Sequence, residues 1–527
     1  MNRLFTALVA AAALSVASCS SHGPTIAPPP PTGKYSNSSL NGNYAFVTSG
    51  EAITSGATAA TPFSRTGSFT ANGSGTITGG VYDLVNAGGT STATGPIPIT
   101  GGSYSVSANG RGTMTFNITS NGAPATLTFA IVLTSTSDGL MMDETASGSQ
   151  ASTGSGNFIL QNPATFAVGG SYVFDFTGLD GNSAGPFPES LVGQFAASGG
   201  VITSGTEDAN DDMALTSSGS ITGSFTLDSA NTAAGRGIAI IESQAYAFYI
   251  VDSTRVRFIS INSGGVGPML TGDAVLQTNS VPPPATALST SFVFLVSGSS
   301  ANGGLTRVGR LSSNGSTLSN MVMDVNNGGS ENEFGSGSLS NGSITYDATT
   351  GRGTLSFQSS SVNVYSFIFY LSSPSSGVIQ EVSGPNASTA TVVADGSLLA
   401  QSGTFSSSTI TGPYAMNWSG LVTSAGSLGS QDEEDLLAQA NISNLGLSGT
   451  SDIFQFTGVT LNMGVGTAGQ ITLNGDGTAN NTMTVSLSQV TPIDMVVYLV
   501  NPQLVFFANR DNNGATRIVA GILRAQQ

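Results

Sequence analysis

The chain has 527 residues, a formal net charge of −17, and only 8% charged residues. This acidic balance argues against nucleic acid and anionic lipid headgroups as partners. Hydrophobic residues make up 39% of the chain, so it is not a disordered protein, and its length allows several separate cores.

The N-terminal segment has the pattern of a bacterial export signal. Arg3 precedes an apolar stretch from Leu4 to Val16, which is too short to cross a bilayer as a helix. Val16-Ala17-Ser18-Cys19 resembles the bacterial lipobox. The resemblance implies cleavage before Cys19 and a lipid anchor built on it, with several acyl chains giving stable attachment to the membrane. Because Ser20 rather than aspartate follows, the same resemblance implies the outer membrane or cell surface.

The residue inventory excludes several catalytic chemistries. Cys19 is the only cysteine, so the exported protein has no disulfide bond. The one histidine, His22, and the one lysine, Lys34, both follow the anchor closely. Ser–His triads, Cys–His pairs, histidine-ligated zinc and lysine nucleophiles are therefore excluded, and we expect no enzyme. The alternative for Cys19 is an ordinary secretory signal with a chance cysteine.

After a signal peptide at 1–18, residues 19–38 are rich in serine and proline and predict a semi-stiff tether. The remaining chain repeats with a period of about 120 residues. We expect four homologous units at 39–163, 164–280, 288–403 and 404–527, with a proline linker at 281–287.

Three landmarks recur in the same order in each unit. An aromatic strand opens it, at Tyr44, Tyr172, Phe292 and Tyr414. A glycine turn lies in the middle, at 109–113, 235–237, 351–354 and 474–478. A strand ending in glutamine closes it, at Gln161, Gln277, Gln401 and Gln526.

Alternating apolar residues within each unit predict antiparallel strands with one face on a core and the other in water. Examples are Leu127 to Leu133 and Tyr365 to Leu371. The fold class is therefore all-β, with each of the four modules a small up-and-down barrel or a β-sandwich of about eight strands. The segment Gln431 to Asn441 is the best candidate for a short helix or a loop insertion.

The openings Gly42-Asn43-Tyr44 and Gly412-Pro413-Tyr414 resemble the start of calycin barrels, the lipocalin relatives, with tyrosine in place of tryptophan. This resemblance covers one strand per unit and implies a barrel. Over its full length the chain resembles the glycine- and serine-rich tandem β-repeat lipoproteins of bacterial surfaces. That resemblance implies an envelope location and no particular activity.

Oxygen-rich side chains give one metal candidate. Asp208, Asn210 and Asp212 alternate as calcium ligands do, so Ca²⁺ is the one cofactor considered, although the glycine and final acid of a calcium loop are missing. Asp83 to Asn86 and Asp324 to Asn327 occupy similar places in their units. The alternative is that these residues form turns.

Arg111, Arg236 and Arg352 recur at one turn position. They are interpreted as structural, each pairing with an acid on a neighbouring strand or loop; the alternative is an anion site. Neighbouring acids such as Asp143-Glu144, Glu207-Asp208 and Glu433-Glu434-Asp435 are interpreted as solvated loop acids.

Three functions remain open. The first is a non-enzymatic envelope lipoprotein with a structural, adhesive or ligand-binding role, whose ligand would be an extracellular glycan or a small apolar molecule. The second is a carbohydrate-binding or carboxylate-dependent glycan-active protein, with aromatic residues such as Tyr414 and Trp418 as a sugar platform instead of core. The third is an integral outer-membrane barrel, against which the lipid anchor and the outward serines count.

Overall fold

The computed structural model describes residues 33–54, 60–86, 95–120, 122–147, 150–162, 167–181, 187–261, 267–360, 363–384, 388–403, 405–406, 408–423, 431–455, 460–473, 481–487, 492–510 and 516–527. The signal peptide, Cys19, His22 and the fourth glycine turn lie outside these ranges. Apart from short 3-10 turns, the described chain is all-β. Nowhere in these ranges does a helix reach the length and apolarity that a membrane crossing requires.

Modules 1 and 4 are closed eight-stranded barrels in which consecutive strands pair antiparallel. After η1 (Asn37–Ser39), module 1 contains β1 (Asn41–Thr54), β2 (Thr61–Asn72), β3 (Thr76–Asn86), β4 (Ile97–Val106), β5 (Arg111–Ser120), β6 (Ala123–Leu133), β7 (Asp138–Ser147) and β8 (Gln150–Leu160). Module 4 contains β27 (Gly412–Thr423), β28 (Gln431–Ser443), β29 (Gly446–Gln455), β30 (Thr460–Thr472), β31 (Thr482–Leu487), β32 (Ile493–Asn501), β33 (Leu504–Asn509) and β34 (Thr516–Ala525).

Module 2 closes through a β10–β11 pairing and carries one extra strand, β12, on β11. Its strands are β9 (Gly170–Leu179), β10 (Pro188–Ser198), β11 (Val201–Asp211), β12 (Ala214–Ser220), β13 (Gly223–Leu227), β14 (Arg236–Ile241), β15 (Gln244–Asp252), β16 (Arg255–Ser260) and β17 (Met269–Leu276), with η3 (Thr232–Ala234) before β14.

Module 3 is a curved sheet whose two edge strands, β21 and β22, do not pair with each other. It follows η4 (Thr278–Ser280) and η5 (Ala285–Leu288), and contains β18 (Ser291–Ser300), β19 (Gly303–Ser313), β20 (Leu318–Asn327), β21 (Ser330–Phe334), β22 (Ser340–Asp347), β23 (Arg352–Gln358), β24 (Val364–Ser373), β25 (Ser376–Glu381) and β26 (Val392–Ala400). The prediction of four all-β modules of about eight strands is confirmed, and the modules are barrels or, in module 3, an incompletely closed barrel.

The first strand of every module carries a glycine six residues after its opening aromatic residue: Gly50, Gly178, Gly298 and Gly420. Each one lies against the backbone of the module's last strand. A Cβ atom placed on Gly298, for example, would lie 2.0 Å from the carbonyl oxygen of Val393 on β26. The first and last strands can therefore approach closely only because no side chain intervenes at this position.

Each module has its own apolar core inside the sheet, which includes the opening aromatic residues. Tyr414 and Trp418 are 1% and 0% exposed in the core of module 4, so they form core and not a sugar platform. Tyr346 of module 3 contacts the proline linker, because its hydroxyl donates to the carbonyl of Pro283 at 2.8 Å. The proline segment therefore packs on module 3.

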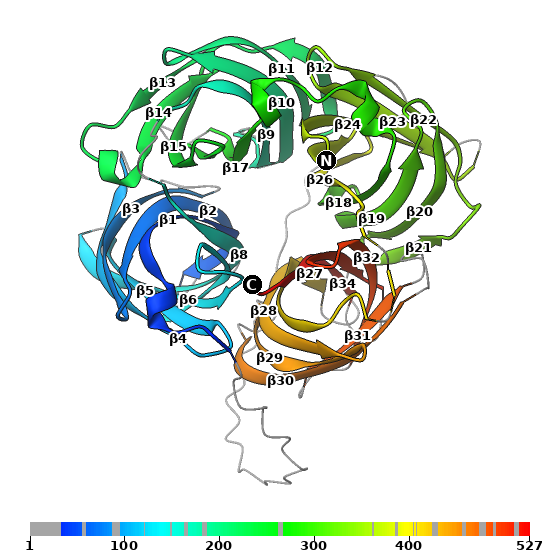
Figure 1. The fold of residues 1–527 in the computed structure, drawn as a ribbon. Helices are drawn as coiled ribbons and strands as arrows, with labels where there is room; N and C mark the ends of the chain where they lie inside the picture. Colours follow the sequence, from blue (N-terminus) through cyan, green and yellow to red (C-terminus); the bar gives the residue numbers. More distant parts are fainter. Residues whose placement is uncertain are drawn as a thin grey trace, which may run out of the picture.

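The four modules form a closed ring, in which module 1 meets both module 2 and module 4 (Figure 1). A separate apolar cluster fills each of the four junctions. Strands at these junctions are buried on both faces. In β6, for instance, Ala130 and Val132 pack against module 4 while Phe129 and Ile131 point into the barrel. The expectation that such strands keep one face in water is therefore wrong, because the second face is covered by the next module.

Two further expectations are corrected at the junction of modules 1 and 4. Residues 431–443 form β28 rather than a helix or loop. Leu436 and Ala438 pack inside the barrel, and Leu437 packs against module 1, so alternate side chains are buried on the two faces of the barrel wall. The tether ends before Ser38: Tyr35 is only 7% exposed, and its hydroxyl donates to the carbonyl of Gln527 at 2.7 Å. The segment from Tyr35 thus packs beside the C-terminus.

Replacing Gly298 with alanine should lower the free energy of unfolding by about 1–3 kcal/mol, because the added Cβ overlaps the backbone of β26. Gly335→Ala in the same module is the matched control, since its Cβ would meet no atom within 4 Å. Urea unfolding of both variants checks this; equal stabilities would show that the close approach of β18 and β26 is not required.

Candidate functional site at the module interfaces

The closing glutamines lie at the module interfaces and bind the next module in the ring. The Nε2 atom of Gln161 donates to the carbonyl of Ile250 in module 2 at 2.7 Å. Gln277 reaches Leu371 in module 3 at 2.9 Å, and Gln401 reaches Leu499 in module 4 at 2.7 Å. Gln526 returns to Leu133 of module 1 at 2.7 Å. The same contact therefore occurs four times and closes the ring.

An aspartate on the third strand of each module faces the next module in the ring. Asp83 of module 1 accepts from Arg236 Nε at 2.8 Å and Nη2 at 2.9 Å. Asp208 of module 2 accepts from Arg352 Nε and Nη2, both at 2.7 Å. Both guanidinium groups bind their carboxylate in the bidentate side-on geometry that arginine favours.

A tyrosine from the next module binds the same carboxylates. The hydroxyl of Tyr249 donates to Asp83, and that of Tyr370 to Asp208, each at 2.6 Å. Burial first, and the neighbouring carboxylate second, raise the pKa of both tyrosines, so the hydroxyls remain donors. We call each set of closing glutamine, aspartate, tyrosine and arginine a clamp.

The remaining two clamps are incomplete. Between modules 4 and 1, Arg111 binds Asp452 with one nitrogen on both oxygens, and Val132 stands opposite Arg111 where the other modules have tyrosine. Between modules 3 and 4, Tyr498 donates to Asp324 at 2.6 Å, but the clamp has no arginine. The three recurring arginines thus each bind an acid across a module interface.

The calcium candidates are already engaged in the interface of modules 2 and 3. Asp208 belongs to a clamp, and the amide of Asn210 donates to the carbonyls of Glu381 and Val392 at 3.3 and 2.8 Å. Asp212 lies in the β11–β12 turn with a positive φ of 47°. Among the described residues there is no group of three or more His, Cys, Asp or Glu side chains placed to hold a metal ion. Calcium at these residues remains a prediction.

The acid pairs interpreted as solvated loop acids lie on strands and are largely buried, so that interpretation is wrong. Asp143, Glu434 and Asp435 are 0% exposed. They lie on β7 and β28, where module 1 packs against module 4, and two of them are neutralised: Asp143 pairs with Arg65, and Glu434 with Arg517 at 3.0 Å. Both arginines belong to the same module as the acid they bind, whereas Asp435 is reached across the interface by the hydroxyl of Thr153 at 2.7 Å. These partners replace the water that a loop acid would bind.

Not every buried acid has a counter-charge. Both oxygens of Glu144 are buried without a hydrogen-bond partner. Burial first, then the charge of Asp452, raises the pKa of Glu144 to about 8. Asp175 of β9 and Asp395 of β26 lie together across the interface of modules 2 and 3, and burial raises the pKa of both. Glu144 therefore holds a proton at neutral pH.

A cavity of about 340 Å³ lies where modules 1, 2 and 4 meet. Glu51 of module 1 and Glu433 of module 4 line it, together with serine, threonine and apolar side chains. Burial, followed by the charges of Asp435 and Glu51, raises the pKa of Glu433 well above its ordinary range. We call this space the three-module cavity; it places a carboxyl of raised pKa beside a second acid.

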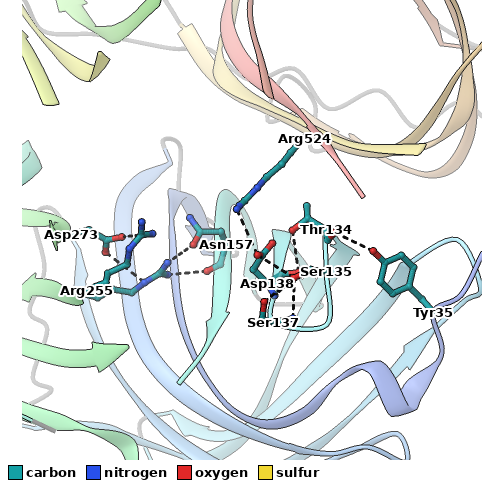
Figure 2. Close-up of polar contacts among 10 residues, drawn as sticks. Tyr35, Thr134, Ser135, Ser137, Asp138, Asn157, Arg255, Asp273 and Arg524 are labelled. Atoms are coloured by element: carbon teal, nitrogen blue, oxygen red, sulfur yellow. Dashed lines mark hydrogen bonds and ion pairs between the residues drawn. The ribbon is translucent and has the colours of Figure 1, made fainter. Parts of the chain in front are cut away.

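Module 1 makes further polar contacts with both neighbours (Figure 2). From module 2, Arg257 donates to the carbonyl of Asn157 at 3.1 Å and lies 3.6 Å from Asp273. From module 4, Arg524 lies 3.6 Å from Asp138. Nearly all described arginines are thus bound to acids, so the described part of the ring presents no basic patch for an anionic ligand.

Comparison with known proteins gives no family. No protein-family model and no curated protein matches the chain. Similar solved structures include a double mutant of the vaccine antigen transferrin binding protein B from Haemophilus parasuis, with 9% identity, a TM-score of 0.21, and coverage of 74% of this chain and 83% of that chain. Another is intact Ap-TbpB with its N and C lobes, with 10% identity, a TM-score of 0.16, and coverage of 73% and 83%. Similarity at this level carries no inference about function.

Sequence reasoning found the glutamines, the arginines and the aspartates separately but did not join them. It missed Tyr249, Tyr370 and Tyr498. Their signal was the continuous apolar run around each tyrosine, for example Tyr246 to Val251, which is typical of strands buried on both faces.

Replacing Asp208 with alanine should lower the free energy of unfolding by about 3 kcal/mol, because Arg352 and Tyr370 lose a buried anionic partner. Glu333→Gln is the control: it removes an exposed ion pair with Arg510 and should cost less than about 1 kcal/mol. Urea unfolding of the full ring measures both.

A separate measurement tests the calcium interpretation. A rise of the wild-type melting temperature with added Ca²⁺, lost in Asp208→Ala, would support calcium binding at these residues.

The pKa of Glu144 in the folded protein, about 8, exceeds its ordinary value of 4.5. Folding therefore binds a proton between these pH values, and the group makes the fold less stable as pH rises through this window. Glu144→Gln should raise the free energy of unfolding by about 1–3 kcal/mol at pH 8 and have little effect near pH 4.5. Denaturation at both pH values, with exposed Glu242→Gln as control, measures this. An equal effect at both pH values would contradict it.

Proposed function

We propose that the protein is a lipid-anchored envelope protein, held by Cys19 at the outer membrane or cell surface, that displays a closed ring of four β-barrels. Its role is structural, adhesive or ligand-binding, and it is not catalytic. The observation that carries this proposal is the clamp. The polar residues shared by the modules hold neighbouring modules together, as Gln526 and Arg111 do between modules 4 and 1.

The shared polar residues therefore form no repeated active centre. The barrel interiors are filled by aromatic and aliphatic side chains, unlike barrels that hold a small apolar ligand in the lumen. Ligands would instead bind at the loops or at the junctions between modules. A closed ring suits ligand binding at the junctions, because contacts between modules already fix the junction geometry and little conformational entropy is lost on binding.

The three-module cavity favours one second function, the binding or carboxylate-dependent cleavage of a glycan. Glu51 and Glu433 come from different modules and line the same space, and an acid of raised pKa beside another carboxyl is the arrangement that glycoside hydrolysis uses. The hydroxyl-bearing residues around them, including Ser49 and Thr271, suit the hydrogen bonding of sugar hydroxyls.

One set of experiments tests both functions. In bacteria the wild-type protein should fractionate with membranes, and Cys19→Ser should be recovered in the aqueous fraction; recovery of both with water-soluble proteins would contradict the anchor. The Cys19→Ser ring is then assayed on a glycan panel for binding and for release of reducing ends. We expect binding without turnover. Turnover lost in Glu433→Gln and kept in Glu242→Gln would establish the second function and overturn the non-enzymatic role.

A further inference from the structure

A cavity of about 460 Å³ lies between modules 2 and 3, beside the clamp that joins them. Its volume is typical of small-molecule sites. Strands β11 and β12 line it on one side, and β22, β23 and the turn between them line it on the other. We call it the clamp-side cavity. Its lining is mainly hydroxyl-bearing and charged: Thr206, Ser218, Thr345, Thr350, Asp347 and Arg352.

The arginine of this clamp is less enclosed than its counterpart between modules 1 and 2. The side chain of Arg352 is 22% exposed, and that of Arg236 is 4% exposed. Both use Nε and Nη2 to bind an aspartate across the interface. The third nitrogen differs. Nη1 of Arg236 donates to Asp228 at 2.6 Å, whereas Nη1 of Arg352 has no hydrogen-bond partner among the described residues.

The difference goes with the turn that precedes each arginine. Asp228 and Asp347 correspond, because each lies opposite its arginine across a hairpin. The turn is shorter in module 3 than in module 2, and there the carboxylate binds its own turn. Asp347 accepts from the backbone N–H of Thr349 at 2.8 Å and from the hydroxyl of Thr350 at 3.2 Å. Arg352 and Asp347 therefore line one cavity without an ion pair between them.

The clamp-side cavity thus presents hydrogen-bond donors at one point and acceptors at another. Arg352 supplies the N–H groups of Nη1, and Asp347 supplies a carboxylate. The backbone N–H of Thr349 is the first cause that holds the pKa of Asp347 below its ordinary value, so this carboxylate is ionised at neutral pH. An anion would be repelled by Asp347 and a cation by Arg352. A hydroxyl group, which is uncharged and both donates and accepts, suits the two together.

We propose that the clamp-side cavity binds a neutral saccharide. One sugar hydroxyl accepts from Nη1 of Arg352, and a neighbouring hydroxyl donates to the carboxylate of Asp347. The threonine and serine hydroxyls from both modules supply further donors and acceptors. This inference rests on the ligand-binding role proposed above and gives that role a ligand class and a place separate from the three-module cavity.

The test is ligand-observed NMR titration of the soluble Cys19→Ser ring with the methyl glycosides of glucose, galactose and mannose. We expect saturable binding of at least one glycoside. Glucuronic acid should bind at least fivefold more weakly than methyl glucoside, because its carboxylate is repelled by Asp347.

Two threonines give a matched pair of variants. The hydroxyls of Thr345 and Thr354 hydrogen-bond to each other at 2.7 Å, so replacing either one with leucine removes the same bond. Only Thr345 lines the cavity. Thr345→Leu, which fills part of the cavity and removes a hydroxyl, should weaken glycoside binding at least tenfold, and Thr354→Leu should change it less than twofold.

A second matched pair tests the carboxylate. Asp347→Asn keeps an oxygen for the backbone N–H of Thr349 but removes the negative charge, and should weaken glycoside binding at least tenfold. Asp252→Asn is its control, because Asp252 likewise accepts from a backbone N–H two residues on, that of Thr254 at 2.7 Å, and does not line the cavity. It should leave the affinity unchanged.

The outcomes separate this site from the wider ligand-binding role. Glycoside binding that is unchanged in both Thr345→Leu and Asp347→Asn would overturn the site and leave the role intact. No binding of any glycoside by the Cys19→Ser ring would overturn the saccharide class itself. Tighter binding of glucuronic acid than of methyl glucoside would overturn the preference for a neutral ligand and indicate an anion site at Arg352.

Discussion

The ring depends on carboxylates that one module buries and the next module neutralises. Asp83 and Asp208 would be costly to bury in an isolated barrel, because a lone charge loses its hydration without compensation. Docking of the next module supplies a guanidinium group and a phenol hydroxyl to each, while a closing glutamine such as Gln161 satisfies carbonyls of that module. The polar contacts have strict geometry, so they fix how neighbouring barrels align, and the apolar clusters around them supply the burial that holds the modules together.

Closure of the ring explains features of the chain that isolated barrels would not. Strands at the junctions are apolar on both faces, as in β6 and β15. Acids such as Asp435 are buried because module 1 covers them, with Thr153 donating to Asp435 at 2.7 Å. The junction of modules 1 and 4 joins the two ends of the described chain, where Tyr35 binds the C-terminal residue. Because the lumens are filled, a ligand of the proposed function would bind at the junctions or loops.

The repeats could be predicted from sequence because their landmarks, such as Tyr44 and Gln161, recur in fixed order within each unit. Barrel closure could not, because period-two alternation is the same in a barrel and a sandwich. The first-strand glycines, such as Gly298, indicate only that the first and last strands meet, which also happens in the incompletely closed module 3. The role of Gln161 and Arg236 was hidden for a different reason. Their partners, Ile250 and Asp83, lie in another module, and sequence spacing does not report such contacts. Glu433 to Asp435 resemble a solvated run until the covering module is known.

Cross-linking across the junction of modules 1 and 4 tests the closed ring most directly. Ser155 and Asn417 contact each other there through their side chains, and replacing both with cysteine in the Cys19→Ser background leaves a single thiol pair. A closed ring predicts an intramolecular cross-link in the monomer with a short bifunctional thiol reagent, identified by mass spectrometry of the joined peptides. Cross-links found only between different molecules, or none at all, would contradict the ring.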